Sequence, residues 1–190
     1  MAECQDLCER FGVERRRATI QHLYQEYAEY HDQDFTVKPD RIAVHEKQIQ
    51  LENENKAWVY AVIDVNTKVV LHDRISQHRG PDLAEQFLSE LKEKLRVRDV
   101  VFLVDGMGYL TALARTDLSG DLNYSDRNII ETLFQPFTIR IDRSHETWNG
   151  SQDSAERWLT AYAAYYNHHR SHQSPDNQPP VEALKQEGSI

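Results

Sequence analysis

The segment Val100-Val101-Phe102-Leu103-Val104-Asp105-Gly106 decides the predicted fold of this chain. It is an apolar run of strand length that ends on a carboxylate and is followed at once by a glycine, which favours a turn. A carboxylate at the end of a buried strand is well placed to hold a metal ion or a reacting group at the edge of a sheet. Asp105 is therefore the first candidate functional residue, and the alternative is that it only caps the turn at Gly106.

The segments around this strand predict an α/β fold. Residues before it form three strand-like runs separated by turn residues, which predicts an antiparallel meander over 41–51, 57–65 and 68–74. Helical periodicity, with tryptophan and tyrosines supplying packing area in the last helix, predicts helices over 83–95, 109–115 and 151–168. Residues 117–121 are rich in turn formers and are interpreted as a connection.

Length and composition describe one globular unit. The chain has 190 residues, of which 39% are hydrophobic, with only 7 Gly and 6 Pro, so wholesale disorder is not expected. No apolar stretch approaches the roughly 18–20 residues that cross a bilayer, and the N-terminus has no signal-peptide pattern. Cys4 and Cys8 are interpreted as free thiols. These features predict a cytoplasmic protein that does not enter a membrane.

The net charge of −9 argues against a generally basic nucleic-acid binder. The acidic residues are spread along the whole chain, as is typical of proteins adapted to a high-salt cytosol. An ordinary acidic soluble protein has the same composition, and composition alone does not separate the two.

The N-terminal region holds a run of three arginines. Residues 4–30 read as helical with a break at Gly12, and the second helix carries Arg15, Arg16 and Arg17. In a helix-turn-helix such a helix enters the major groove, with its arginines near phosphates. The alternative is a solvated helix face, which is the more common setting of an arginine run.

Three elements combine into a possible catalytic site. They are the strand Ile42-Ala43-Val44-His45-Glu46, the strand ending in Asp105, and a later helix that carries Glu131. In a ribonuclease H-like sheet the first and fourth strands are neighbours, and a following helix directs a third carboxylate at their ends. Such a cluster binds two Mg²⁺ ions roughly 3.5–4 Å apart and catalyses phosphoryl transfer.

At these residues the sequence resembles the DDE transposases of insertion sequences, which have an integrase-like catalytic core, and most closely the copies from halophiles. The resemblance extends from about Phe11 to about Leu184. The matching segments are Ala43-Val44-His45-Glu46-Lys47, Phe102-Leu103-Val104-Asp105-Gly106, Asp126-Arg127-Asn128-Ile129-Ile130-Glu131 and Tyr165-Tyr166-Asn167-His168-His169-Arg170-Ser171-His172-Gln173.

The resemblance implies a role for each matching residue. Asp105 would be the second metal-binding aspartate and Glu131 the third acid, together holding Mg²⁺. Arg127 precedes Glu131 as in the family, and Arg140 and Arg143 lie where family members carry basic residues able to contact DNA phosphates; all three are expected to bind DNA. The implied partners are the ends of the element, the target DNA and further copies of the chain.

The resemblance also implies a domain division. The fold class it predicts is α/β, with a ribonuclease H-like mixed sheet flanked by helices and preceded by a partial helix-turn-helix. Residues 1–36 would form the DNA-binding segment and linker, and residues 37–190 the integrase-like catalytic domain.

The sequence departs from the family pattern in three places. His45 stands where the family has its first aspartate, and imidazole is a poor ligand for Mg²⁺. Glu46 does not replace that aspartate, because adjacent strand residues point to opposite faces. Pro136 interrupts the helix after Glu131, and the first part of the DNA-binding domain is expected to be missing.

Three functions remain open at this point. The chain is a Mg²⁺-dependent transposase impaired by His45, a catalytically dead remnant that binds DNA or intact transposase subunits, or a ribonuclease H-like nuclease unrelated to transposition. The cluster His168, His169 and His172 is interpreted as structure near the core rather than as a metal site.

Overall fold

The computed structural model describes residues 39–51, 56–95, 100–104, 107–121, 147–148, 151–171 and 177–186, together with Thr19, His22, Leu23, Glu26 and Gln135. The described part is built on one mixed sheet with helices on both faces.

The sheet begins with the predicted antiparallel meander. Strands β1 (Arg41–Leu51), β2 (Lys56–Asp64) and β3 (Val70–Ser76) pair in sequence order. Strand β4 (Val101–Leu103) then lies parallel to β1, and β5 (Ser119–Asp121) lies parallel to β4. The strand order is therefore β3-β2-β1-β4-β5, and the short β6 (Thr147–Trp148) pairs with the end of β1. The first and fourth strands are neighbours, as the sequence predicts.

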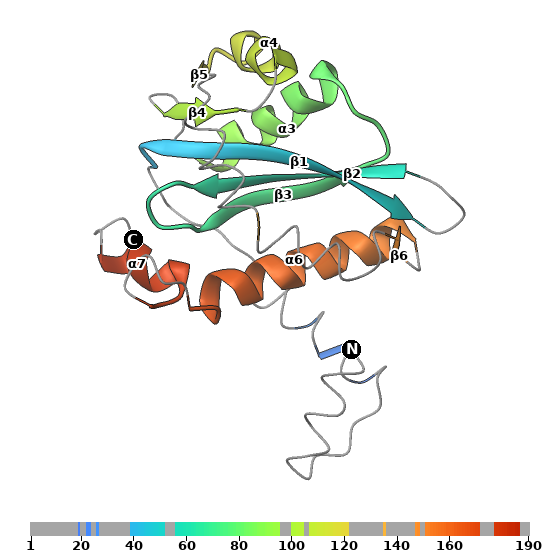
Figure 1. Ribbon diagram of the computed structural model, residues 1–190, viewed down its shortest axis with the longest axis vertical. Helices are drawn as coiled ribbons and strands as arrows, with labels where there is room; N and C mark the ends of the chain where they lie inside the picture. Colours follow the sequence, from blue (N-terminus) through green and yellow to red (C-terminus); the bar gives the residue numbers. More distant parts are fainter. Residues whose placement is uncertain are drawn as a thin grey trace.

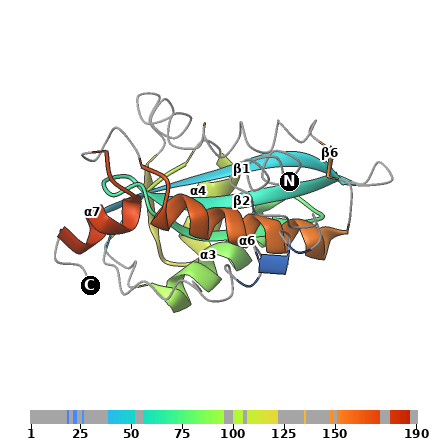
Figure 2. The ribbon, with the colours of Figure 1, turned by 90° about the horizontal axis from the view of Figure 1, so that it is seen from below.

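Different helices cover the two faces of the sheet. Helices α3 (Pro81–Lys94) and α4 (Met107–Arg115) lie on one face. Helix α6 (Gln152–His168) lies along the other face, with α7 (Pro180–Gln186) next to its end (Figures 1 and 2). Alternation along β1 divides the core, because Ile42 and Val44 pack with α3 and α4 whereas Ala43 and Ile49 pack with α6.

Local sequence explains where the helices begin. Pro81 occupies the start of α3, where its missing N–H costs nothing, and the buried residues that follow recur at helical spacing. In α6 the Ser151 hydroxyl accepts a hydrogen bond from the Ser154 N–H at 3.3 Å, which caps the helix. The predicted helix over 151–168 is thus confirmed.

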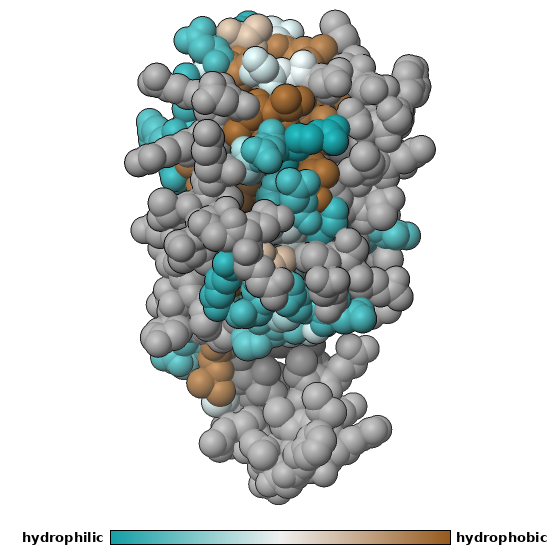
Figure 3. Space-filling model, turned by 90° about the vertical axis from the view of Figure 1, so that its left-hand side faces the viewer, coloured by the Kyte–Doolittle hydropathy of each residue, from teal (hydrophilic) through white to brown (hydrophobic). Residues whose placement is uncertain are grey.

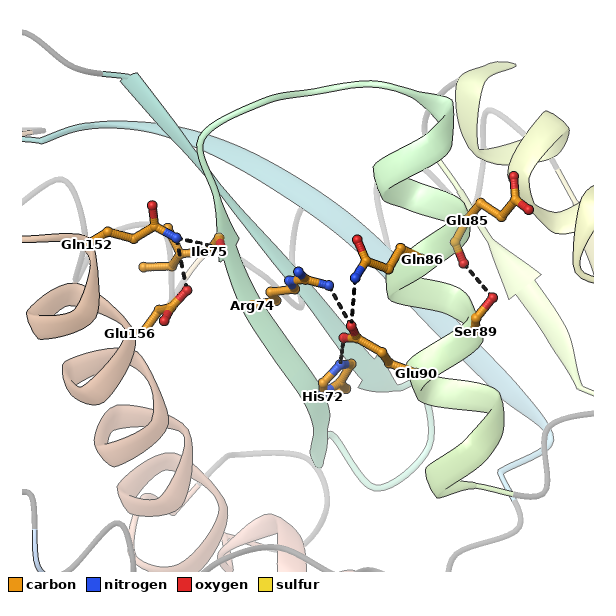
Figure 4. A network of polar contacts seen from close by, with 9 residues as sticks. All are labelled: His72, Arg74, Ile75, Glu85, Gln86, Ser89, Glu90, Gln152 and Glu156. Atoms are coloured by element: carbon orange, nitrogen blue, oxygen red, sulfur yellow. Dashed lines mark hydrogen bonds and ion pairs between the residues drawn. The ribbon is translucent and has the colours of Figure 1, made fainter.

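The two ends of α6 are tied to the backbone of the edge strand β3. The Asn167 side chain, fully buried, accepts a hydrogen bond from the Val70 N–H at 2.8 Å and donates one to the Val70 carbonyl at 2.9 Å. Gln152 donates to the Ile75 carbonyl at 3.3 Å (Figure 4). The side chains of α6 therefore take the place of a neighbouring strand along part of this edge.

The interpretation of residues 117–121 as a connection is only partly correct. A turn that includes Asp117, with a φ of 54°, leads directly into β5. The strand is only three residues long and contains Gly120, so it carries no alternating pattern that a sequence could reveal. Pairing with β4, rather than local propensity, makes it a strand.

Gly120→Ala is expected to destabilise the protein by roughly 1–3 kcal/mol. A Cβ at this position would collide with Leu113 and lie 3.2 Å from Leu110, since β5 passes close under α4. Chemical denaturation should show the loss. Gly108→Ala in α4 is the matched control, because a Cβ there meets nothing within 4 Å and removes only chain flexibility. Equal effects of the two substitutions would contradict close packing at Gly120.

Much of the visible surface of the described part is polar. On the face drawn in Figure 3, apolar side chains gather at the height of α4 and the β4–β5 pair, and hydrophilic ones predominate below them. Large exposed hydrophobic side chains among the described residues are Leu23, Val101 and Tyr165. None of the described helices combines the length and the apolar character that a bilayer crossing needs.

Candidate active site on the central strands

His45 lies in the middle of β1, on the face of the sheet that α6 covers. It is partly buried and stands opposite Ala61 of β2, which in turn stands opposite Asp73 of β3. Ala43, two residues before His45, and Ala61 both pack in the α6 cluster, which fixes the face to which His45 belongs.

Strand β4 runs beside the part of β1 that leads to His45. Arg41 pairs with Val101, Ile42 with Phe102 and Ala43 with Leu103. Leu103 and Ala43 pack in the same α6 cluster, so the two parallel strands present the same face at the same level. The buried Val104 follows β4 and is the last described residue before Asp105.

All of the other predicted site residues lie outside the described part of the chain. These are the acids Asp105 and Glu131 and the arginines Arg15, Arg16, Arg17, Arg127, Arg140 and Arg143. Pro136 and His172 also lie outside it. Within the N-terminal segment, Thr19, His22, Leu23 and Glu26 are helical, and His22 contacts Glu26 one turn later at 3.3 Å. The helix-turn-helix stays a prediction.

The described residues do not fit a Mg²⁺ ion. Mg²⁺ prefers carboxylate, carbonyl and water oxygens, whereas His45 offers an imidazole nitrogen. The described ranges also hold no group of three or more His, Cys, Asp or Glu side chains arranged to bind a metal.

Glu46, the neighbour of His45, lies on the opposite face of the sheet and is already engaged. Its side chain is only 8% exposed and forms an ion pair with Arg79 through Oε1. The Tyr109 hydroxyl donates a hydrogen bond to Oε2 at 3.3 Å. Glu46 and His45 therefore lie on opposite faces, in agreement with the alternation of strand residues.

Aromatic side chains surround the Glu46 carboxylate. Tyr60 stands opposite Glu46 on β2, and its ring lies edge-on to that of Tyr109, with 6.5 Å between centroids. The pKa of Tyr60 is raised by burial and by the charge of Glu46. Arg79 lies over the Trp58 ring, 4.8 Å from its centroid. The alternation of strand residues predicts the face on which Glu46 lies. It does not predict these partners, which come from β2, α4 and the connection after β3.

Asp73 is a second acid near His45 that sequence reasoning missed. It shares the α6 face with His45, across Ala61. Burial raises the pKa of Asp73 to about 7, against the opposing charge of Lys94 and with a further contribution from Glu156. The sequence around Asp73 has no periodic pattern that would predict which side chains surround it in the fold.

Asp73→Asn is expected to stabilise the protein at pH 8 by roughly 1–3 kcal/mol and to change its stability little at pH 4. Between about pH 4 and 7 the folded protein binds a proton at Asp73 that the unfolded chain has lost, so natural stability falls as pH rises through this window. Urea denaturation at both pH values measures the difference. A gain that is the same at pH 4 and pH 8 would contradict titration of Asp73 in this window.

Comparison with solved structures places the described architecture in a known fold. The catalytic core domain of BIV integrase superimposes with a TM-score of 0.54 at 10% identity, covering 80% of this chain and 98% of that one. The Mos1 strand transfer complex gives 0.51 at 12% identity, covering 96% and 69%. The chain has the ribonuclease H-like fold of integrase and transposase catalytic cores.

A third ribonuclease H-like structure, the simian T-cell lymphotropic virus intasome, gives a TM-score of 0.51 at 7% identity. The match covers 78% of this chain and about half, 55%, of that one. In sequence, the chain matches no family model and no curated protein. At identities this low the ribonuclease H-like fold is shared, and the chemistry rests on the individual residues.

Proposed function

We propose that this chain is a DNA transposition protein of the insertion-sequence transposase type whose strand cleavage and joining are impaired. One observation carries the proposal. His45 stands on the central strand β1, next to β4, at the position that the family resemblance assigns to the first catalytic carboxylate.

The register of β1 and β4 supports the placement of the second acid. His45 is two positions after Ala43 on β1. Asp105 is likewise two positions after Leu103, the residue of β4 that pairs with Ala43. A register that continues unchanged would bring positions 45 and 105 side by side on the α6 face. Asp105 and Glu131 would then be the remaining metal-binding acids, and Mg²⁺ would be held incompletely.

The chemistry at this site explains the impairment. Strand cleavage and joining are phosphoryl transfers, in which positioning and stabilisation of charge supply most of the rate. A histidine is neutral or cationic and offers one nitrogen, so it does not replace the charge or the two oxygens of an aspartate. The proposed protein therefore keeps the scaffold but lacks part of the chemistry.

Binding to DNA does not need the missing carboxylate. In the proposed assignment residues 1–36 carry Arg15, Arg16 and Arg17 toward DNA, and residues 37–190 add Arg127, Arg140 and Arg143. Copies of the chain would assemble on the element ends. The alternative function follows from the same histidine: a remnant that only binds DNA or pairs with intact transposase subunits.

The test combines DNA binding with strand joining by the natural chain. We expect binding to element-end DNA that weakens steeply as salt rises, and Mg²⁺-dependent joining at or near background. Robust joining by the natural protein would overturn the impaired site. Affinity unchanged by replacing Arg15, Arg16 and Arg17 with alanine would overturn the helix-turn-helix assignment.

A further inference from the structure

The Glu46 carboxylate connects three parts of the fold. It belongs to β1, its ion pair reaches Arg79 in the connection between β3 and α3, and its hydrogen bond reaches Tyr109 in the first turn of α4. Helix α4 begins at Met107, two residues after Asp105 in the chain. We propose that Glu46 is a positioning residue, which fixes the start of α4 and the connection before α3 against β1 and so holds the surroundings of the proposed site at His45.

The burial of Glu46 is what makes this role specific. Its side chain is 8% exposed, two residues after Val44 on β1 and opposite Tyr60 on β2, and both of these residues belong to the cluster on the α3 and α4 face. Arg79, in contrast, is 60% exposed, so only the Glu46 end of the ion pair leaves water and the pair by itself adds little stability. The distinctive property of Glu46 is that its one buried carboxylate joins both Arg79 and Tyr109 to β1.

Both oxygens of Glu46 are used, and each partner is held in turn. Arg79 pairs with Oε1 and lies over the Trp58 ring, while its side chain stays 60% exposed. Tyr109 bonds to Oε2 and is itself buried, with its ring against Tyr60. A shift of α4 along the sheet would break the Tyr109 bond before it changed the apolar packing, because hydrogen bonds tolerate less displacement than hydrophobic contacts.

A matched pair for comparison exists elsewhere on the same face. Arg74 of β3 donates to Glu90 of α3 at 2.6 Å, and Glu90 also contacts His72 and Gln86 (Figure 4). This network also joins a strand to a helix through a carboxylate and an arginine. It lies on the edge strand, two strands away from β1. Glu90→Gln therefore controls for the loss of a carboxylate that is not attached to α4.

The first experiment compares backbone hydrogen exchange of the natural protein with that of three variants, and it does not depend on activity. Glu46→Gln and Tyr109→Phe are each expected to speed exchange of the α4 amides after its first turn about tenfold, with β2 unchanged. Glu90→Gln should leave α4 unchanged. Unchanged α4 exchange in both variants, or an equal rise in α4 and β2, would overturn the positioning role.

The second experiment asks whether the restraint matters for chemistry, and it rests on the proposed function. In a His45→Asp background, adding Glu46→Gln or Tyr109→Phe is expected to lower kcat for strand joining about tenfold without changing KM for DNA. An unchanged kcat would overturn the role. If His45→Asp alone has no activity, the proposed function fails, and the exchange measurement still decides the inference about Glu46.

Discussion

His45→Asp is expected to raise Mg²⁺-dependent strand joining by roughly 100-fold or more over the natural chain. The substitution restores a carboxylate on β1, next to the strand that leads to Asp105. A third oxygen-bearing group would complete the ligand set that a hard cation needs, and His45 is partly exposed, so the smaller side chain should be accepted without unfolding. Joining of labelled DNA ends, followed over time at one stated salt concentration, measures the gain.

His45→Asn separates charge from shape in this experiment. Asparagine has nearly the same size as aspartate but no negative charge, so it should give no gain. Asp105→Ala added to His45→Asp should return joining to background. Joining that survives Asp105→Ala would refute the assignment of the whole site. A silent His45→Asp protein with a normal melting temperature would show that His45 is not the lesion, and Pro136 would become the next residue to replace.

Asn167→Leu is expected to lower the free energy of unfolding by roughly 2–5 kcal/mol. Asn167 bonds to both the N–H and the carbonyl of Val70, and leucine would remove both of these buried hydrogen bonds. The melting temperature should fall by roughly 5–15 °C for a chain of this size. Thermal unfolding followed by circular dichroism measures the change.

Gln152→Ala is the matched control for Asn167, since it removes a contact between the same helix and the same strand. Its single bond to the Ile75 carbonyl is longer, 3.3 Å, and only partly buried. We expect a loss within about 1 kcal/mol, because water can replace this bond. A loss at Gln152 equal to that at Asn167 would refute the special role of the buried amide.

The sequence predicted the central architecture because that information is local. Apolar runs and intervening turn residues defined β1, β2 and β3, and helical spacing defined α6. The two faces of β1 also followed from alternation, which separated His45 from Glu46 correctly. The ribonuclease H-like strand order was an expectation from resemblance, and the pairing of β1 with β4 confirms it.

What the sequence did not predict depends on residues far apart in the chain. Glu46 and Tyr109 are separated by 63 positions, and Val70 and Asn167 by 97. No periodic pattern links such pairs, since tertiary packing alone brings them together. The raised pKa of the partly buried Asp73 was missed for the same reason, and β5 was missed because its pairing, not its composition, makes it a strand.

Neighbouring residues 45 and 46 of β1 lie on opposite faces of the sheet, so a change at one does not disturb the contacts of the other. Glu46 and its partners maintain the scaffold on one side, while residue 45 faces the other side, so exchanging Asp and His there leaves the Glu46 contacts in place. Aspartate and histidine codons differ by a single base. Under the proposed function, one point mutation at position 45 would therefore switch strand joining on or off in a chain whose Glu46 contacts stay in place.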